Sequence, residues 1–246
     1  MGALILETMT WPEVEAEIRG GRETIVIPFG STEQHGPHLP LGTDAMLGDA
    51  IGEAVAARLD AFLAPTVRIG CSSHHLAFPG TLSIEDDTFH RVVADVVRSV
   101  ARHGLRRIVL LPTHGGNFAP LGAAVEKIGP LPGVKLVAFS DVGLLAEAML
   151  GLGAELGIPA EEGGIHAGEW ETSMMLALRP ELTRMDRAEP GYTGSLMEGM
   201  QTMATRGTDA VAKNGIFGDP RRACAESGRR YVERIVERVL AAIDQA

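Results

Sequence analysis

Residues 30–44 contain two carboxylates and two imidazoles within one short segment: Glu33, His35, His38 and Asp44. Imidazole nitrogen combined with carboxylate oxygen suits zinc, manganese or iron, rather than calcium or a thiolate-bound metal. The segment directly follows residues 24–29, an apolar run with the composition of a buried strand. Open α/β sheets carry their chemistry just beyond the carboxyl ends of such strands. The segment therefore predicts a metal-centred active site.

The spacing inside this segment favours a shared site. Glu33 and His35 are separated by one residue, so in an extended segment their side chains point to the same side. Asp44 lies at the expected start of a helix, where its two carboxylate oxygens could bridge two ions. The alternative is a polar loop in which Asp44 only caps the helix and His35 packs against its neighbours.

A second group of polar residues, His114-Gly115-Gly116-Asn117, follows the apolar run 107–112. A histidine at this strand end would meet the first segment if the two strands are neighbours in the sheet. The glycines would let backbone amides approach a substrate, and Asn117 could cap the next helix. The alternative is a capped helix beside a surface histidine.

A third group lies at the opening of an apolar helix and consists of His166, Glu169 and Glu171. Glutamates two positions apart on a helix point to different sides, so at most one of them would meet a metal. The other would complement the helix dipole. His74 and His75 lie on a further loop, where they would either face the substrate or form a solvated or packed pair.

Four apolar runs predict strands at residues 24–29, 62–68, 107–112 and 134–140. Helical spacing predicts helices at residues 44–59, from 83–86 to 104, and from Asp219-Pro220 onward. This alternation implies a three-layer α/β/α sandwich with a mostly parallel central sheet, formed by residues 1–246 as one domain. Residues 185–218 show no clear periodicity and predict a long loop that is functional or packs against another subunit.

The chain has 246 residues, of which 45% are hydrophobic, so it can bury a full core. Its formal net charge of −10 predicts no nucleic-acid or membrane partner, because phosphate groups would be repelled. Residues 1–7 lack the basic region of a signal peptide, so we expect a cytoplasmic protein. Cys71 and Cys224 fit no metal-ligand spacing. The missing Walker loop, dinucleotide fingerprint and Gly-x-Ser-x-Gly elbow disfavour nucleotide enzymes and serine hydrolases.

Together these motifs resemble the creatininase family of metal-dependent amidohydrolases over residues 24–230. The resemblance is carried by residues 30–40, Asp44, 114–117 and 166–173, with further similarity at 78–81 and 215–220. It implies an enzyme that hydrolyses a C–N amide bond at a centre of two divalent metal ions, zinc or else manganese or iron. It also implies a homo-oligomer, for which a hexamer is one form.

The resemblance assigns five metal ligands: Glu33, His35, Asp44, His114 and Glu169. Glu33 and His114 would bind one ion and His35 the other, with Asp44 bridging them. Creatininase has a glutamate ligand where this chain has Gly116, so Glu169 is expected to replace it. Glu171 is the alternative ligand, or else a catalytic residue.

For catalysis, the resemblance implies that two ions lower the pKa of a bridging water to give hydroxide near neutral pH. His166 would shuttle a proton to the departing nitrogen, and His75, Gly115 and Gly116 would contact substrate. The expected substrate is a cyclic or small linear amide, or a short peptide. Alternatives are a peptidase of the mycofactocin-precursor type and a non-catalytic metal-binding scaffold of the same fold.

Overall fold

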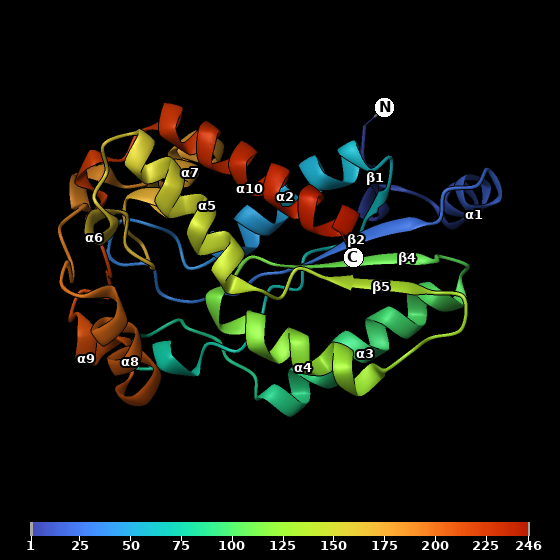
Figure 1. Ribbon diagram of the computed structural model, residues 1–246, viewed down its shortest axis with the longest axis horizontal. Helices are drawn as coiled ribbons and strands as arrows, with labels where there is room; N and C mark the ends of the chain where they lie inside the picture. Colours follow the sequence, from blue (N-terminus) through green and yellow to red (C-terminus); the bar gives the residue numbers. More distant parts are fainter. Residues whose placement is uncertain (1, 246) are drawn as a thin grey trace.

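The computed structural model describes residues 2–245, and a five-stranded parallel sheet lies at its centre (Figure 1). The strand order is β1-β3-β2-β4-β5. The strands are β1 (Leu4–Ile5), β2 (Thr24–Phe29), β3 (Phe62–Leu63), β4 (Arg107–Pro112) and β5 (Lys135–Ala138). Every neighbouring pair is parallel. The α/β fold with a parallel sheet is confirmed, and two predicted strands match β2 and β4 residue for residue.

The other two predicted strands are longer than those observed. A strand was expected at 62–68, but β3 ends at Leu63, and Val67 returns to the sheet only through a single bridge to Phe29. Pro65 lies between them and cannot donate a ladder hydrogen bond. β5 covers four of the seven residues expected at 134–140. β1 is two residues long, too short for a hydrophobic pattern to reveal.

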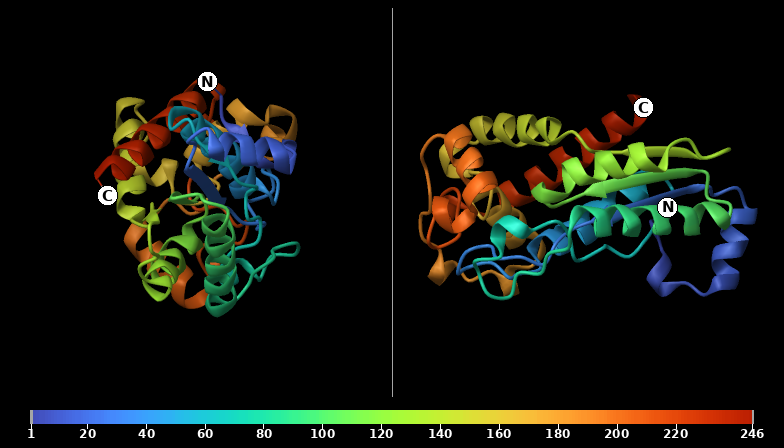
Figure 2. Two further views of the ribbon diagram at one scale, coloured as in Figure 1. Left: turned by 90° about the vertical axis from the view of Figure 1, so that its right-hand side faces the viewer. Right: turned by 90° about the horizontal axis from the view of Figure 1, so that it is seen from below.

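Helices cover both faces of the sheet, as the three-layer prediction requires (Figures 1 and 2). One face carries α2 (Thr43–Arg58), α5 (Val142–Glu155), α7 (Glu169–Leu178) and α10 (Ala225–Gln245). The other carries α3 (Asp86–Arg102) and α4 (Phe118–Ile128), with α1 (Trp11–Arg19) at its edge. Successive strand residues serve the two faces alternately: Val26 and Val109 pack with the first group, and Ile25 and Ile108 with the second.

One helix prediction needs correction. The last helix was expected to begin at Asp219-Pro220, but these residues form a single 3₁₀ turn, Pro220–Arg222, and α10 begins at Ala225. The Asp219 side chain does accept a capping hydrogen bond from the backbone N–H of Arg221. Asp219 therefore does cap a turn, as its sequence position predicted. The turn ends after Arg222, because the backbone at Ala223 is extended.

Residues 185–218 are also not the long loop that was expected. They contain α8 (Leu196–Arg206) and α9 (Thr208–Val211), which lie beyond the carboxyl ends of the strands (Figure 1). The Ser195 hydroxyl accepts a hydrogen bond from the backbone N–H of Glu198 and so caps α8. The short helix α6 (Ala160–Gly163) completes this end of the molecule. No helix within residues 2–245 is long and apolar enough to cross a membrane.

A buried polar network joins α7 to α10. The Tyr231 hydroxyl donates to Glu169 Oε2 at 2.8 Å, and the Ser173 hydroxyl donates to Glu169 Oε1 at 2.6 Å. The backbone N–H of Cys224 donates to Ser173 Oγ at 3.0 Å. Both oxygens of this buried carboxylate are therefore satisfied inside the fold, and the network holds α7 in a fixed rotational position against α10.

Replacing Tyr231 with phenylalanine should destabilise the protein, because Glu169 Oε2 would remain buried without its donor. We expect the free energy of unfolding, measured by urea denaturation, to fall by about 1–3 kcal/mol. Tyr192→Phe is the matched control, since the Tyr192 hydroxyl donates to the Ser195 carbonyl at an exposed position. Equal losses in the two variants would show that the Glu169 network has no special role.

Candidate metal centre

Four of the five predicted metal ligands meet at the carboxyl edge of β2 and β4. These two strands are paired along their whole length, so the loops that follow them leave the sheet side by side. Glu33 and His35 lie in the loop after β2, and His114 lies two residues beyond the end of β4. Asp44 reaches the same point from the first turn of α2. The condition on which the prediction rested, neighbouring strands, is confirmed.

Asp44 lies between the two histidines. One of its oxygens, Oδ1, is 3.3 Å from His35 Nε2, and the other, Oδ2, is 2.9 Å from His114 Nδ1. Glu33 Oε1 is 3.2 Å from the same His114 nitrogen and 4.0 Å from His35 Nε2. Asp44 does not cap its helix, since the N-cap of α2 is Gly42 and no side chain bonds there. The carboxylate is instead free to face both rings.

Backbone carbonyls fix the orientation of both rings. His35 Nδ1 donates to the Glu33 carbonyl at 3.2 Å, and His114 Nε2 donates to the Cys71 carbonyl at 3.2 Å. A ring nitrogen next to a carbonyl oxygen must carry the proton, so the opposite nitrogen of each neutral ring presents a lone pair. These lone pairs lie on His35 Nε2 and His114 Nδ1, the two atoms that face the carboxylates. Metal-binding histidines are commonly oriented in this way.

The donor set fits a metal. Three of the converging atoms, Glu33 Oε2, His35 Nε2 and Asp44 Oδ2, are buried without a hydrogen-bond partner within residues 2–245. Buried polar atoms are rarely left unpaired, and each costs stability when it is. Metal ions bound between these residues would satisfy all three atoms. Oxygen and imidazole nitrogen are also the ligands that zinc, manganese and iron accept.

The structure separates the two glutamates of α7. Glu171 Oε2 lies 3.8 Å from His35 Nε2, within a group that also includes His166. Glu169 points the other way, into the network with Tyr231 and Ser173 described above. It belongs to none of the potential metal-binding groups among the described residues. The geometry therefore favours Glu171, the alternative ligand, in the place where Glu169 was expected.

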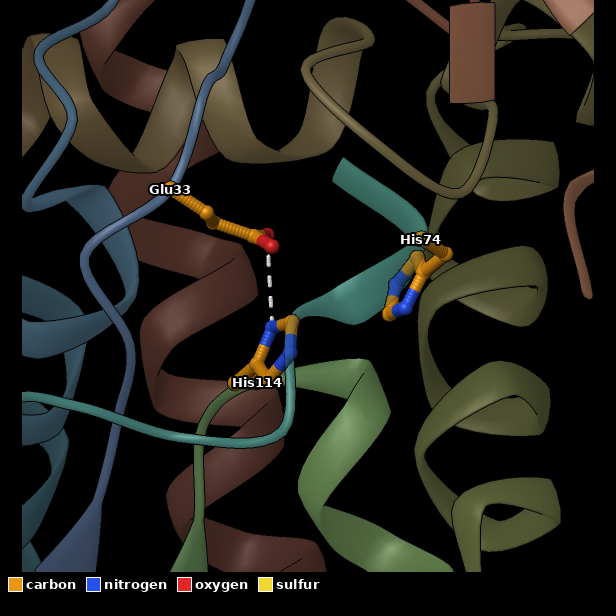
Figure 3. A group of neighbouring side chains, drawn as sticks. All are labelled: Glu33, His74 and His114. Carbon is orange, nitrogen blue, oxygen red and sulfur yellow. Dashed lines mark ion pairs between the residues drawn. The ribbon is translucent and has the colours of Figure 1, made fainter. Parts of the chain in front are cut away.

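Three further histidines surround Glu33. His75 Nε2 is 3.2 Å from Glu33 Oε2, and His166 Nδ1 is 3.7 Å from Glu33 Oε1. The His74 ring lies across from both Glu33 and His114 (Figure 3). It is roughly parallel to the His114 ring, with the ring centres 5.9 Å apart. His38 lies outside the centre, because its Nε2 is hydrogen bonded to the Thr172 hydroxyl at 2.9 Å.

Gln34, which the sequence analysis did not select, connects two of these histidines. Its side-chain amide donates to His75 Nδ1 at 2.9 Å and to the Gly215 carbonyl at 3.0 Å. His166 Nε2 donates to the Gln34 backbone carbonyl at 2.7 Å, which leaves His166 Nδ1 facing the carboxylates. Its position between Glu33 and His35 was the only available signal, because an amide side chain is not among the imidazole and carboxylate ligands expected at such a site.

Ala167 adds a local strain beside His166. Its backbone φ of 54° lies in the left-handed region, which residues other than glycine rarely adopt. This turn aims the Ala167 N–H at Glu171 Oε2, to which it donates. The same segment is held on its other side by a bridge between His166 and Phe217. The strained residue thus places His166 and Glu171 next to each other.

The charges of the centre balance without a metal. Burial alone would lower the pKa of His35, but Asp44, Glu171 and Glu33 raise it to about 10. Burial also opposes protonation of His114, yet Glu33 and Asp44 raise its pKa well above the usual value. Burial raises the pKa of Glu171 to about 7, although His35 opposes this. Protons on the two histidines therefore neutralise the buried carboxylates, and a metal would have to displace them.

His166 and His75 behave in the opposite way. Burial, together with the positive charge of His35, lowers the pKa of His166 well below its usual value. Burial, with His166 next in importance, does the same to His75. Both rings are therefore neutral near pH 7, which leaves each with one nitrogen able to accept a proton.

The pocket at the centre is small, about 70 Å³, and includes Gly115 and Gly116 in its lining. A Cβ at position 116 would lie 2.2 Å from the Cys71 carbonyl oxygen and 2.5 Å from His114 Nε2. Residue 116 therefore has room only for glycine in this conformation. The predicted substrate-contact residues His75, Gly115 and Gly116 all line the pocket, together with Ile165 and Met203.

Comparisons with known proteins identify the family. A family model described as creatinine amidohydrolase matches residues 7–243. The mycofactocin precursor peptide peptidase of Mycobacterium ulcerans is 34% identical, over 93% of this chain and 83% of its own length. The creatinine amidohydrolase of Pseudomonas putida is 32% identical, over 73% of each chain. A solved structure named "Creatininase Mn" superposes with a TM-score of 0.82, at 27% identity over 99% of this chain and 98% of its own. This chain belongs to the creatininase family.

Proposed function

We propose that this chain is a metal-dependent amidohydrolase that binds two divalent ions and cleaves a C–N amide bond. The observation that carries the proposal is Asp44, whose two oxygens each face the ring nitrogen of a different histidine, at 3.3 and 2.9 Å. Glu33 and His114 would hold one ion, and His35 and Glu171 the other. Asp44 would bridge the two. The imidazole and carboxylate ligands fit zinc, manganese or iron.

The ions would supply a Lewis acid and a water of lowered pKa. The surrounding residues would handle the proton and the substrate. His166 is neutral and presents Nδ1 to the centre, because its Nε2 proton is held by the Gln34 carbonyl. It can accept a proton released during attack on the carbonyl and donate it to the departing nitrogen. Gly115 and Gly116 would let the substrate approach close to the backbone.

A short peptide fits better than creatinine as the substrate. Trp11 and Trp170 are the two tryptophans of the chain, and neither lines the pocket. Trp11 is exposed on α1, and Trp170 packs against Gly163. The pocket therefore offers no indole to stack on a small planar ring. A relative named for a precursor peptide supports the peptide class. A non-catalytic scaffold would bind metal but show no chelator-sensitive amide hydrolysis.

Glu171→Gln should reduce the metal content of the purified protein from about two equivalents to about one, because the His35 side loses its second ligand. Glu169→Gln is the matched control on the same helix, and it should retain both ions. Metal analysis by mass spectrometry measures the content. Loss of metal from the Glu169 variant alone would restore Glu169 as the ligand and reject Glu171.

Metal affinity should rise with pH. Without metal, His35 has a pKa of about 10 and Glu171 a pKa of about 7, so both carry protons that binding must displace. Apparent affinity should therefore rise on the order of tenfold per pH unit for each displaced proton, up to the pKa of that group. Calorimetry in buffers of different ionisation enthalpy at pH 7 should show proton release. Binding without release would contradict the charge balance described above.

His166→Ala should lower kcat by on the order of 10²–10⁴-fold, because a proton-transfer group is lost. Metal content should stay unchanged, since His166 is not among the proposed ligands. Activity on peptide amides and metal analysis are measured on the same preparation. A variant that loses metal along with activity would assign His166 as a ligand instead.

A further inference from the structure

His75 is buried beside the metal centre, and both of its ring nitrogens have close polar neighbours. Nδ1 lies 2.9 Å from the side-chain nitrogen of Gln34 and 3.0 Å from the Thr208 hydroxyl. Nε2 lies 3.2 Å from Glu33 Oε2. A neutral imidazole carries one N–H and one lone pair, so the position of its proton decides how the ring acts on Glu33. The neighbours of Nδ1 determine that position.

The backbone fixes the orientation of the Gln34 amide. The Gly36 N–H donates to Gln34 Oε1 at 2.9 Å, and Gln34 Nε2 donates to the Gly215 carbonyl at 3.0 Å. A flipped amide would place two acceptors together at one end and two donors at the other. The second hydrogen of Gln34 Nε2 is therefore available to His75 Nδ1. His166 Nε2, 2.8 Å from the same amide nitrogen, gives its own proton to the Gln34 carbonyl and accepts none.

Because His75 Nδ1 accepts from Gln34, the proton of the neutral ring lies on Nε2. The Thr208 hydroxyl can donate or accept, so it adapts to either form of the ring. The Nε2 proton faces Glu33 Oε2, whereas Glu33 Oε1 faces His114 (Figure 3). Oε2 forms no hydrogen bond within residues 2–245, so its contact with the N–H is close but not aligned. The two oxygens of this carboxylate therefore have different neighbours.

We propose that His75 is a positioning residue for the metal ligand Glu33, and that Gln34 positions His75 by keeping its proton on Nε2. The N–H attracts Glu33 Oε2 and so keeps Oε1 directed at the centre. Carboxylates that bind metals are commonly held by such outer partners. Each carboxylate oxygen has more than one acceptor site, so Oε2 can still contact an ion. The inference rests on the metal centre of the proposed function.

This proton position disagrees with two other roles for His75. The ring lies in a possible metal-binding group with Glu33 and His166, but a protonated Nε2 has no lone pair for an ion. A contact with substrate was expected from the sequence. With Nδ1 bonded to Gln34 and Nε2 facing Glu33, the ring has no polar atom left for a substrate.

The first test locates the proton in the metal-free, full-length protein. NMR chemical shifts of the ring nitrogens distinguish a protonated nitrogen from a bare one, and the spectrum of His75→Gln identifies the His75 signals. We expect a protonated Nε2 and a bare Nδ1. Gln34→Met should weaken this preference, because the donor to Nδ1 is lost. Thr208→Val is the matched control, since it removes the other neighbour of Nδ1, and it should retain the preference.

A proton on Nδ1 in the wild-type protein overturns the inference, and this measurement needs no variant to fold. A preference that is lost in Thr208→Val and kept in Gln34→Met also overturns it, because Gln34 would then not place the proton.

The second test measures zinc affinity by calorimetry. His75→Ala removes the N–H and should weaken binding by about 10–100-fold. His75→Gln keeps an N–H donor near the position of Nε2, so it should restore most of the affinity. His103→Ala is the matched control, because His103 is an exposed histidine at the end of α3, and it should bind like the wild type. Equal losses in the two His75 variants would assign His75 as a ligand. Unchanged affinity in both, with a raised KM, would assign it to the substrate. Either result overturns the inference.

Amide hydrolysis by the same preparations separates this inference from the proposed function. Zinc binding and the expected proton position without hydrolysis of peptide or lactam amides would support the inference and contradict the proposed function. Zinc-dependent hydrolysis with the proton on Nδ1 would do the reverse. A wild-type protein that binds no metal would contradict both, since Glu33 would then be no ligand.

Discussion

The structure of the centre depends on the cost of burying two carboxylates next to each other. Glu33 and Asp44 are almost inaccessible to water, and their shared neighbour His114 lies within 3.2 Å of both. Ionised carboxylates in such a place require positive charge nearby, or else they take up protons. In the protein without metal, His35 and His114 supply that charge. The surrounding fold keeps these charged groups together, although burial disfavours the ionised form of each.

Close backbone approaches hold these groups in position. A Cβ at Gly30 would lie 2.7 Å from the Ala45 Cα, so the end of β2 touches the start of α2 and brings Asp44 to the loop after the strand. The Asn117 side chain donates to the Phe29 and Gly30 carbonyls and accepts from the Cys71 N–H. This amide was expected to cap a helix, but it makes no cap bond. It joins three loops at the edge of the sheet, and each loop contributes to the centre.

Much of this arrangement could be predicted from local patterns, because a strand that ends in polar residues has a defined direction and a defined edge of the sheet. Local patterns could not predict which of Glu169 and Glu171 faces the metal centre. Helical spacing shows that the two diverge, but only the packing of α7 against Tyr231 decides which one turns inward. For α8 a local signal was present, since Ser195 and Glu198 have the spacing of a helix N-terminus. The high content of glycine, methionine and threonine concealed it.

The same carboxylates face two kinds of histidine, and the difference follows from their partners. His35 and His114 each approach both Glu33 and Asp44, so charge attraction outweighs burial and they hold protons. His75 and His166 each form a close pair only with Glu33, and the charges of neighbouring histidines add to the effect of burial, so both stay neutral. A metal would displace protons from the first pair and leave His166 Nδ1 in the second pair free to accept one. Ligands and proton acceptors can therefore share one small pocket, because His35 and His114 each approach two carboxylates while His75 and His166 each pair closely with one.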